Sequence, residues 1–203
     1  SSGHAQLPQE LTALGDARTD AARDSISSLI KLGLRGLLDT DSAFAVNFND
    51  MPMSRVDAPD GSFRLFTWNV QHDDGSFHYE GFLLVKEHKA HVLYTLRDMT
   101  DHIPDPEGAQ LSPENWYGAL YYAGIPVQMA GRAYYTLLGW KGASETETRK
   151  VIDVLSFSGP LPKFGAPLFS DGQRRRREIF AYTAQASMQV KWDADRKAIV
   201  LDH

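Results

Sequence analysis

The spacing of hydrophobic residues divides the chain into a helical part and a longer strand-forming part. Between residues 20 and 38, apolar side chains recur at steps of three and four, which is the period of a helix with one buried face. Those side chains are Ile26, Leu29, Ile30, Leu34, Leu37 and Leu38. Asp16, Thr19 and Asp20 are residue types that cap the start of a helix. The pattern predicts one amphipathic helix over residues 20–38, preceded by a flexible N-terminal segment at residues 1–15.

After residue 43 the pattern changes to short runs of β-branched and aromatic residues, separated by turn-forming clusters. The predicted strands are residues 63–71, 77–87, 91–98, 117–123, 133–140, 149–157, 177–183, 186–192 and 197–202. We therefore predict a mainly β (α+β) fold, with a single domain over residues 16–203 built as an antiparallel β-sandwich or curled open barrel of about 8–10 strands. The N-terminal helix is expected to cover an open face or edge of the sheet.

The first predicted hairpin turns at Asp74-Gly75, a dipeptide typical of two-residue turns. Such a turn pairs His72 with Phe77 and Gln71 with His78, so the two histidines are expected on opposite faces of the sheet. Two histidines on opposite faces cannot bind the same metal ion unless a β-bulge shifts the register of the hairpin. Further along, three prolines between residues 101 and 113 predict a long surface loop.

Charge and composition narrow the classes of partner. The formal net charge is −5, so the overall field favours neither nucleic acid nor an anionic membrane. No apolar run reaches the length of about 18 residues that a transmembrane helix needs, and the chain contains no cysteine. Histidines gather between residues 72 and 102 without the spacing of a known metal motif. We predict no metal site and no cofactor.

Three acids are candidates for catalysis: Asp153, Asp98 and Asp101. A hydrolase that uses paired carboxylates needs two of them on opposite sides of a cleft. Asp153 lies between two apolar residues of a predicted strand, and a carboxylate that is buried there must be paired or shifted in pKa. Strand alternation also allows Asp153 to point outward into solvent.

A surplus of aromatic residues suggests binding instead. Indole and phenol rings combine a flat apolar face with a polar edge, and they stack on sugars or anchor protein partners. The candidates for such a binding surface are Trp116, Tyr117, Tyr122, Tyr135 and Trp140. Core packing is the competing explanation for each of them.

Six sequence blocks resemble a family of uncharacterised exported proteins common in Bacteroidetes. They are PDGSFRLFTWNV (59–70), AYYTLLGWKG (133–142), RKVIDVLSF (149–157), FGAPLF (164–169), REIFAYTAQASMQVKW (177–192) and IVLDH (199–203). The resemblance covers residues 37–203. It implies a periplasmic or cell-surface location, with the export signal outside this sequence, and it implies no activity.

Two functions follow as hypotheses. The first is a non-catalytic exported module that binds a partner protein or a glycan at the cell envelope. The alternative is a hydrolase of envelope or dietary polymers that uses paired carboxylates.

Overall fold

A computed structural model describes residues 2–88, 90–169 and 174–202 of the protein. It begins with two α-helices, α1 (Ser2–Asp16) and α2 (Asp20–Leu38). The strands that follow are β1 (Ser54–Asp57), β2 (Phe63–Gln71), β3 (Phe77–Glu87), β4 (Ala90–Arg97), β5 (Leu120–Met129), β6 (Arg132–Gly142), β7 (Glu147–Ser156), β8 (Lys163–Phe164), β9 (Glu178–Thr183), β10 (Gln189–Asp193) and β11 (Ala198–Asp202). Two short 3₁₀ turns, η1 (Thr100–His102) and η2 (Pro113–Asn115), lie between β4 and β5.

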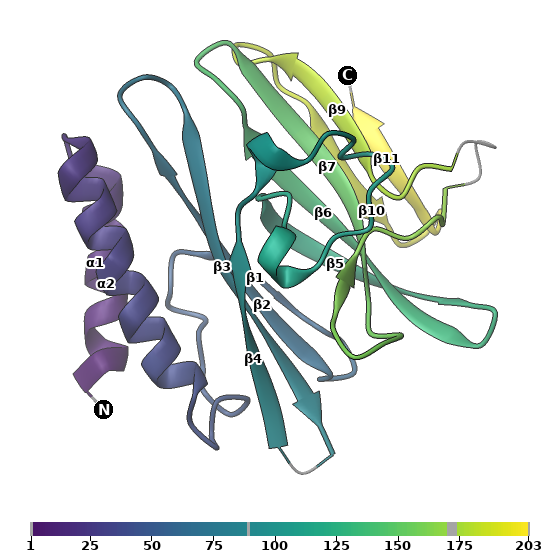
Figure 1. The fold of residues 1–203 in the computed structure, drawn as a ribbon, viewed down its shortest axis with the longest axis horizontal. Helices are drawn as coiled ribbons and strands as arrows, with labels where there is room; N and C mark the ends of the chain where they lie inside the picture. The colour runs from purple at the N-terminus through teal and green to yellow at the C-terminus, as the bar shows by residue number, and fades with distance from the viewer. Residues whose placement is uncertain (1, 89, 170–173, 203) are drawn as a thin grey trace.

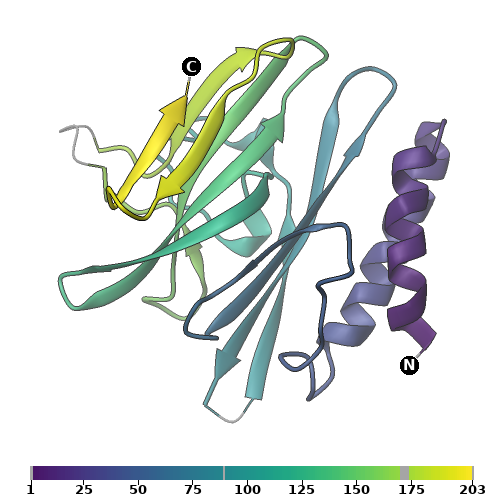
Figure 2. The same cartoon turned by 180° about the vertical axis from the view of Figure 1, so that it is seen from behind.

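The strands form two antiparallel sheets and a separate hairpin. The first sheet has the order β1-β2-β3-β4, and the second has the order β5-β6-β7-β8 with β9 also paired to β7. The helices lie outside the first sheet, while the β10–β11 hairpin lies outside the second (Figures 1 and 2). The prediction of a mainly β, antiparallel fold with a helix over one face is confirmed, and the sheets do not close into a barrel.

The main core lies between the two sheets and is rich in aromatic rings. Its largest buried side chains include Phe63, Tyr79, Trp116, Tyr117 and Tyr121, each at most 1% exposed. Phenylalanine, tyrosine and tryptophan bury more area than aliphatic residues, so these rings supply much of the apolar burial that holds the sheets together. The aromatic surplus in the sequence is therefore mainly core.

The predicted helix at residues 20–38 is confirmed as α2. The Thr19 hydroxyl accepts a hydrogen bond from the Ala22 N–H at 3.2 Å and caps its first turn. Its buried stripe, which includes Ile30 and Leu34, packs in one cluster with Phe66 and Phe82 of the first sheet. This burial explains why the helical period is so regular along α2.

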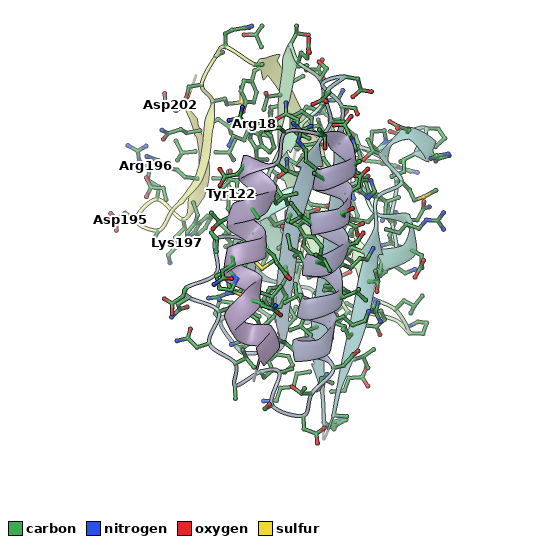
Figure 3. All side chains as sticks on the ribbon, turned by 90° about the vertical axis from the view of Figure 1, so that its left-hand side faces the viewer. Arg18, Tyr122, Asp195, Arg196, Lys197 and Asp202 are labelled. Atoms are coloured by element: carbon green, nitrogen blue, oxygen red, sulfur yellow. The ribbon has the colours of Figure 1, made fainter. Side chains whose placement is uncertain are left out.

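The N-terminal segment that we expected to be flexible forms a helix that the sequence did not predict, α1. The Leu7 side chain is 1% exposed and belongs to the same apolar cluster as Ile30 of α2. In Figure 3, which looks at the helical face, α1 and α2 lie side by side in front of the sheets. The sequence signal was weak because α1 contains Pro8, a residue that usually breaks helices, and has few apolar residues.

The hairpin between β2 and β3 has a longer loop than the sequence suggested. Gln71 pairs with Phe77 and Val70 pairs with His78, so residues 72–76 connect the strands, with Gly75 at a φ of +81°. This shift of one residue moves His78 to the other face of the sheet. The prediction of opposite faces was wrong: His72 and His78 both lie on the face that α2 covers.

Candidate ligand-binding cleft

A cleft of about 870 Å³ lies between the helical pair and the end of β2. Its apolar wall includes Leu11 and Leu14 of α1, and residues 51–54 close it on the side of β1. Residues 67–73 line it without interruption, and Glu145 from the β6–β7 turn completes it. We call this cavity the helix-side cleft. Its volume is within the range of about 300–1,000 Å³ that is typical of ligand sites.

The helix-side cleft exists because β1 is shorter than β2. β1 pairs only with residues 64–67 of β2, so the edge of β2 from Trp68 to Gln71 has no neighbouring strand on that side. Side chains of a strand alternate between its two faces. An unbroken row of lining residues therefore means that the strand edge itself borders the cleft.

The alternation of the ladder identifies which backbone groups point toward this free edge. The Phe63 carbonyl accepts a hydrogen bond from Ala58 N–H on the β1 side, whereas the His72 N–H donates to Ser76 O on the β3 side. Because successive residues of an antiparallel strand direct their backbone groups to opposite edges, the odd-numbered residues face β1 or the space beyond its end. The N–H and C=O groups of Asn69 and Gln71 therefore point into the helix-side cleft.

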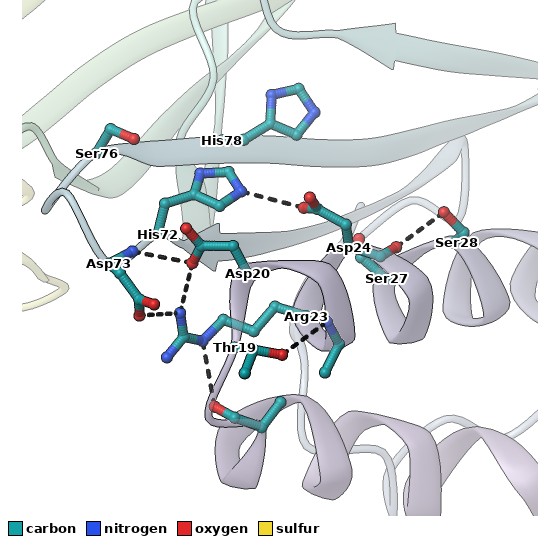
Figure 4. Close-up of polar contacts among 12 residues, drawn as sticks. Thr19, Asp20, Arg23, Asp24, Ser27, Ser28, His72, Asp73, Ser76 and His78 are labelled. Carbon is teal, nitrogen blue, oxygen red and sulfur yellow. Dashed lines mark hydrogen bonds and ion pairs between the residues drawn. The ribbon is translucent and has the colours of Figure 1, made fainter.

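A charged cluster fixes one end of the helix-side cleft (Figure 4). Arg23 Nη1 contacts Asp20 Oδ1 at 2.7 Å and Asp73 Oδ1 at 2.6 Å, and Asp20 Oδ1 also accepts from the Asp73 N–H. The hydrogen bond that Arg23 donates to Asp73, with the charge of both carboxylates, raises the pKa of Arg23 above its usual value. His72 Nε2 lies 3.1 Å from Asp24 Oδ1. These contacts tie the β2–β3 loop to the first turns of α2.

Three other polar side chains at the helix-side cleft have no partner among the described residues, whereas Thr67 Oγ1 accepts from the Tyr121 N–H. The amides of Asn69 and Gln71 and the carboxylate of Glu145 form no hydrogen bond or ion pair in this part of the chain. The sequence contained a partial signal for this site, because Thr67, Asn69 and Gln71 put a polar stripe on an otherwise apolar strand. It contained no signal that β1 would begin only at Ser54 and leave the edge of β2 beyond Thr67 free.

A second, smaller cleft of about 450 Å³ lies between the β3–β4 hairpin and the chain that follows β7. It is lined by Tyr94, Tyr135 and Phe157, with Arg132 at its rim. The Tyr135 hydroxyl donates to Asp60 Oδ2 at 2.6 Å. Burial, followed by this hydrogen bond, raises the pKa of Tyr135.

The predicted aromatic binding residues do not form one surface. Trp116 and Tyr117 are at most 1% exposed and belong to the core, and Tyr135 is 3% exposed beside the second cleft. Tyr122 (Figure 3) is 41% exposed, and its hydroxyl donates to Val190 O at 2.7 Å. Trp140 is half-buried and packs edge-on against Phe77. Sequence alternation alone did not separate the core rings from the surface rings, because both sheets are covered on both faces.

The predicted catalytic acids are also separated from the two clefts, and none of them lines either one. Asp153 is fully buried, and its Oδ2 accepts from Arg177 Nε at 2.8 Å and from the Tyr121 hydroxyl at 2.9 Å. Asp98 accepts hydrogen bonds from the Tyr79 N–H and from Thr100 Oγ1. Asp101 is exposed on η1. The partners of Asp153 and Asp98 are those of structural carboxylates.

Comparison of the chain with family models, with curated proteins and with solved structures found no match. Within the described ranges, no group of three or more histidine, aspartate or glutamate side chains is placed to hold a metal ion. No helix in these ranges combines the length and the apolar character needed to cross a membrane.

Proposed function

We propose that the protein is a non-catalytic exported module of the cell envelope that binds a partner protein in the helix-side cleft. The observation that carries this proposal is the free edge of β2, which borders a cavity large enough for a ligand and presents unpartnered backbone and side-chain groups to it. A sheet edge with free N–H and C=O groups is a template on which another chain can pair.

The lining favours a protein over a glycan. Sugars stack on exposed aromatic faces, and among the described residues Trp68 is the one tryptophan, tyrosine or phenylalanine that lines the helix-side cleft. Its ring is 4% exposed, and its Nε1 donates to Ser27 Oγ of α2 at 3.0 Å, so it belongs to the wall. The leucine and methionine side chains that also line the cleft, Leu11, Leu14, Met51 and Met53, suit the apolar residues of a protein segment.

The envelope location rests on the resemblance of residues 37–203 to exported proteins. The acidic net charge of −5 and the binding cleft are compatible with such a location. A location test is direct: fusion of the full-length protein to a reporter that fluoresces only in the cytoplasm should give a dark signal, and a bright signal would contradict export.

Binding is tested with two matched tryptophan variants. Gln71→Trp places a large ring at the exposed mouth of the helix-side cleft, whereas Gln128→Trp makes the same change at an exposed position of β5 outside both clefts. Each protein is immobilised, and proteins and glycans retained from an envelope extract are identified by mass spectrometry. We expect one protein to be retained in equal amount by the wild type and Gln128→Trp, and to be lost from Gln71→Trp.

Two results would contradict the proposal. Retention that does not change in Gln71→Trp would place the binding surface elsewhere. Retention of a glycan in place of a protein, with the same dependence on Gln71, would assign the helix-side cleft to the other ligand class.

A further inference from the structure

We infer that the partner binds as an added β-strand along the free edge of β2, through an extended segment in which apolar and basic residues alternate. This inference rests on the proposed function, because it specifies how the helix-side cleft holds its partner. The segment takes the position that β1 would occupy if β1 continued past Ser54.

The backbone geometry sets the core of the interaction. Asn69 and Gln71 each direct one N–H and one C=O toward the helix-side cleft, and among the described residues no backbone group is bonded to them on that side. Residues at positions i and i+2 of a strand lie about 7 Å apart, so a segment of about five residues spans both. An extended peptide that adds to a sheet edge satisfies such groups with main-chain hydrogen bonds.

The two walls of the cleft set the alternation of the segment. One wall is apolar and carries Leu11 and Leu14 of α1. The other wall carries the side chains of Asn69 and Gln71, together with Glu145. Side chains of an added strand alternate between two faces, so every second residue of the segment faces the helices and the others face the polar wall.

Charge complementarity makes the polar-facing residues basic. Glu145 is exposed and has no ion-pair partner in the described chain. Within the described ranges, Arg23 is the one arginine or lysine that lines the helix-side cleft, and it already contacts Asp20 and Asp73. A lysine or arginine of the segment therefore meets an unpaired carboxylate, whereas an acidic residue meets repulsion.

The orientation follows from β1, which is antiparallel to β2. In an antiparallel pair, residues that are directly opposite each other share a face, and residues of a hydrogen-bonded pair direct their backbone groups toward each other. The basic residues of the segment, which share the face of Asn69 and Gln71, are therefore the ones whose N–H groups bond to β2.

The test uses the intact protein and fluorescein-labelled peptides of the sequence Lys-Val-Lys-Val-Lys, measured by fluorescence anisotropy. One derivative carries N-methyl groups on its lysines, and a second carries them on its valines. We expect the lysine-methylated peptide to bind about thirtyfold more weakly than the parent, since two backbone hydrogen bonds are lost at about 1 kcal/mol each. The valine-methylated peptide should bind like the parent.

Glu145→Gln, with the exposed Glu114→Gln as its control, tests the charge term. We expect Glu145→Gln to weaken binding of the parent peptide several-fold at low salt and Glu114→Gln to leave it unchanged. An equal effect of both methylation patterns, or no binding of the parent peptide, would overturn strand addition. The pull-down result would be unaffected in that case: an envelope protein retained by the wild type and lost from Gln71→Trp would still support binding in the helix-side cleft. The two proposals can therefore fail separately.

Discussion

Two buried cations lie against the ring of Tyr117 between the sheets, and they differ in how their charge is balanced. Lys141 Nζ is 4.7 Å from the ring centroid and Arg177 Cζ is 5.6 Å from it. Both residues are at most 3% exposed. Arg177 contacts the buried carboxylate of Asp153. Among the described residues, Lys141 donates to two neutral oxygens and to no carboxylate: Thr100 Oγ1 at 2.9 Å and Gly118 O at 2.6 Å.

The two environments shift the two pKa values in opposite directions. Burial lowers the pKa of Lys141 to about 8, and the more distant Asp98 and Asp101 offset this only in part. Burial alone lowers the pKa of Arg177 as well, but the charge and the hydrogen bond of Asp153 raise it overall. A buried cation thus keeps its proton firmly when a carboxylate touches it, and holds it weakly when only dipoles do.

The largest expected loss of unfolding free energy comes from replacing Arg177, the cation that is paired with Asp153. Arg177→Met leaves Asp153 buried without its ionic partner, and breaking a buried ion pair from one side costs about 3–5 kcal/mol. It also removes the bond from Arg177 Nη1 to Pro106 O, which holds the loop between η1 and η2. Urea denaturation measures the change in unfolding free energy.

The control for this prediction is Arg174→Met, a change of the same type at an exposed neighbour. We expect its unfolding free energy to stay within about 0.5 kcal/mol of the wild type. If the two variants lost similar stability, the buried pair would not be a main support of the fold.

The next largest effect is a change of the unfolding free energy with pH, which arises from the titration of Lys141. The folded pKa of about 8 is below the unfolded value of 10.5, so between these values the unfolded chain binds more protons and stability rises with pH. The expected gain between pH 7.5 and 9.5 is about 2 kcal/mol. Above pH 10 the buried tyrosines Tyr79 and Tyr117 act in the opposite sense, because their pKa values are raised in the fold.

Urea denaturation at a series of pH values measures this rise in the wild type and in Lys141→Met. The unfolding free energy of Lys141→Met should not rise over this pH range. The difference between the wild-type and variant curves gives the contribution of Lys141 apart from that of other titrating groups. A rise that persists in Lys141→Met would assign it to another residue.

The sequence predicted the elements well where the signal is local. The helical period of α2 and the alternation in β2 and β3 are properties of consecutive residues, and all three elements begin and end at the predicted positions. α1 was missed because its stability depends on packing of Leu7 against α2, which no local pattern records.

The candidate site was less predictable because it depends on distant pairings. Asp153 was singled out as a carboxylate that must be paired if buried, but its partner Arg177 lies 24 residues further on, in a run of arginines that looks solvent-exposed in the sequence. The helix-side cleft depends on the length of β1, where Val56 is the one buried residue of the strand. A strand with so little apolar content gives no signal of where it ends.

The smallest effect is expected from removing the unpaired cation at neutral pH. Lys141→Met abolishes two hydrogen bonds to Thr100 and Gly118, but it also abolishes the cost of burying a charge, and methionine fills a similar volume. These terms oppose each other, so we expect the unfolding free energy at pH 7 to stay within about 1 kcal/mol of the wild type. Arg177→Met, the same replacement at the other cation beside Tyr117, serves as the reference in the same urea titration. Equal losses in the two variants would mean that the neutral oxygens around Lys141 stabilise its charge as well as Asp153 stabilises that of Arg177.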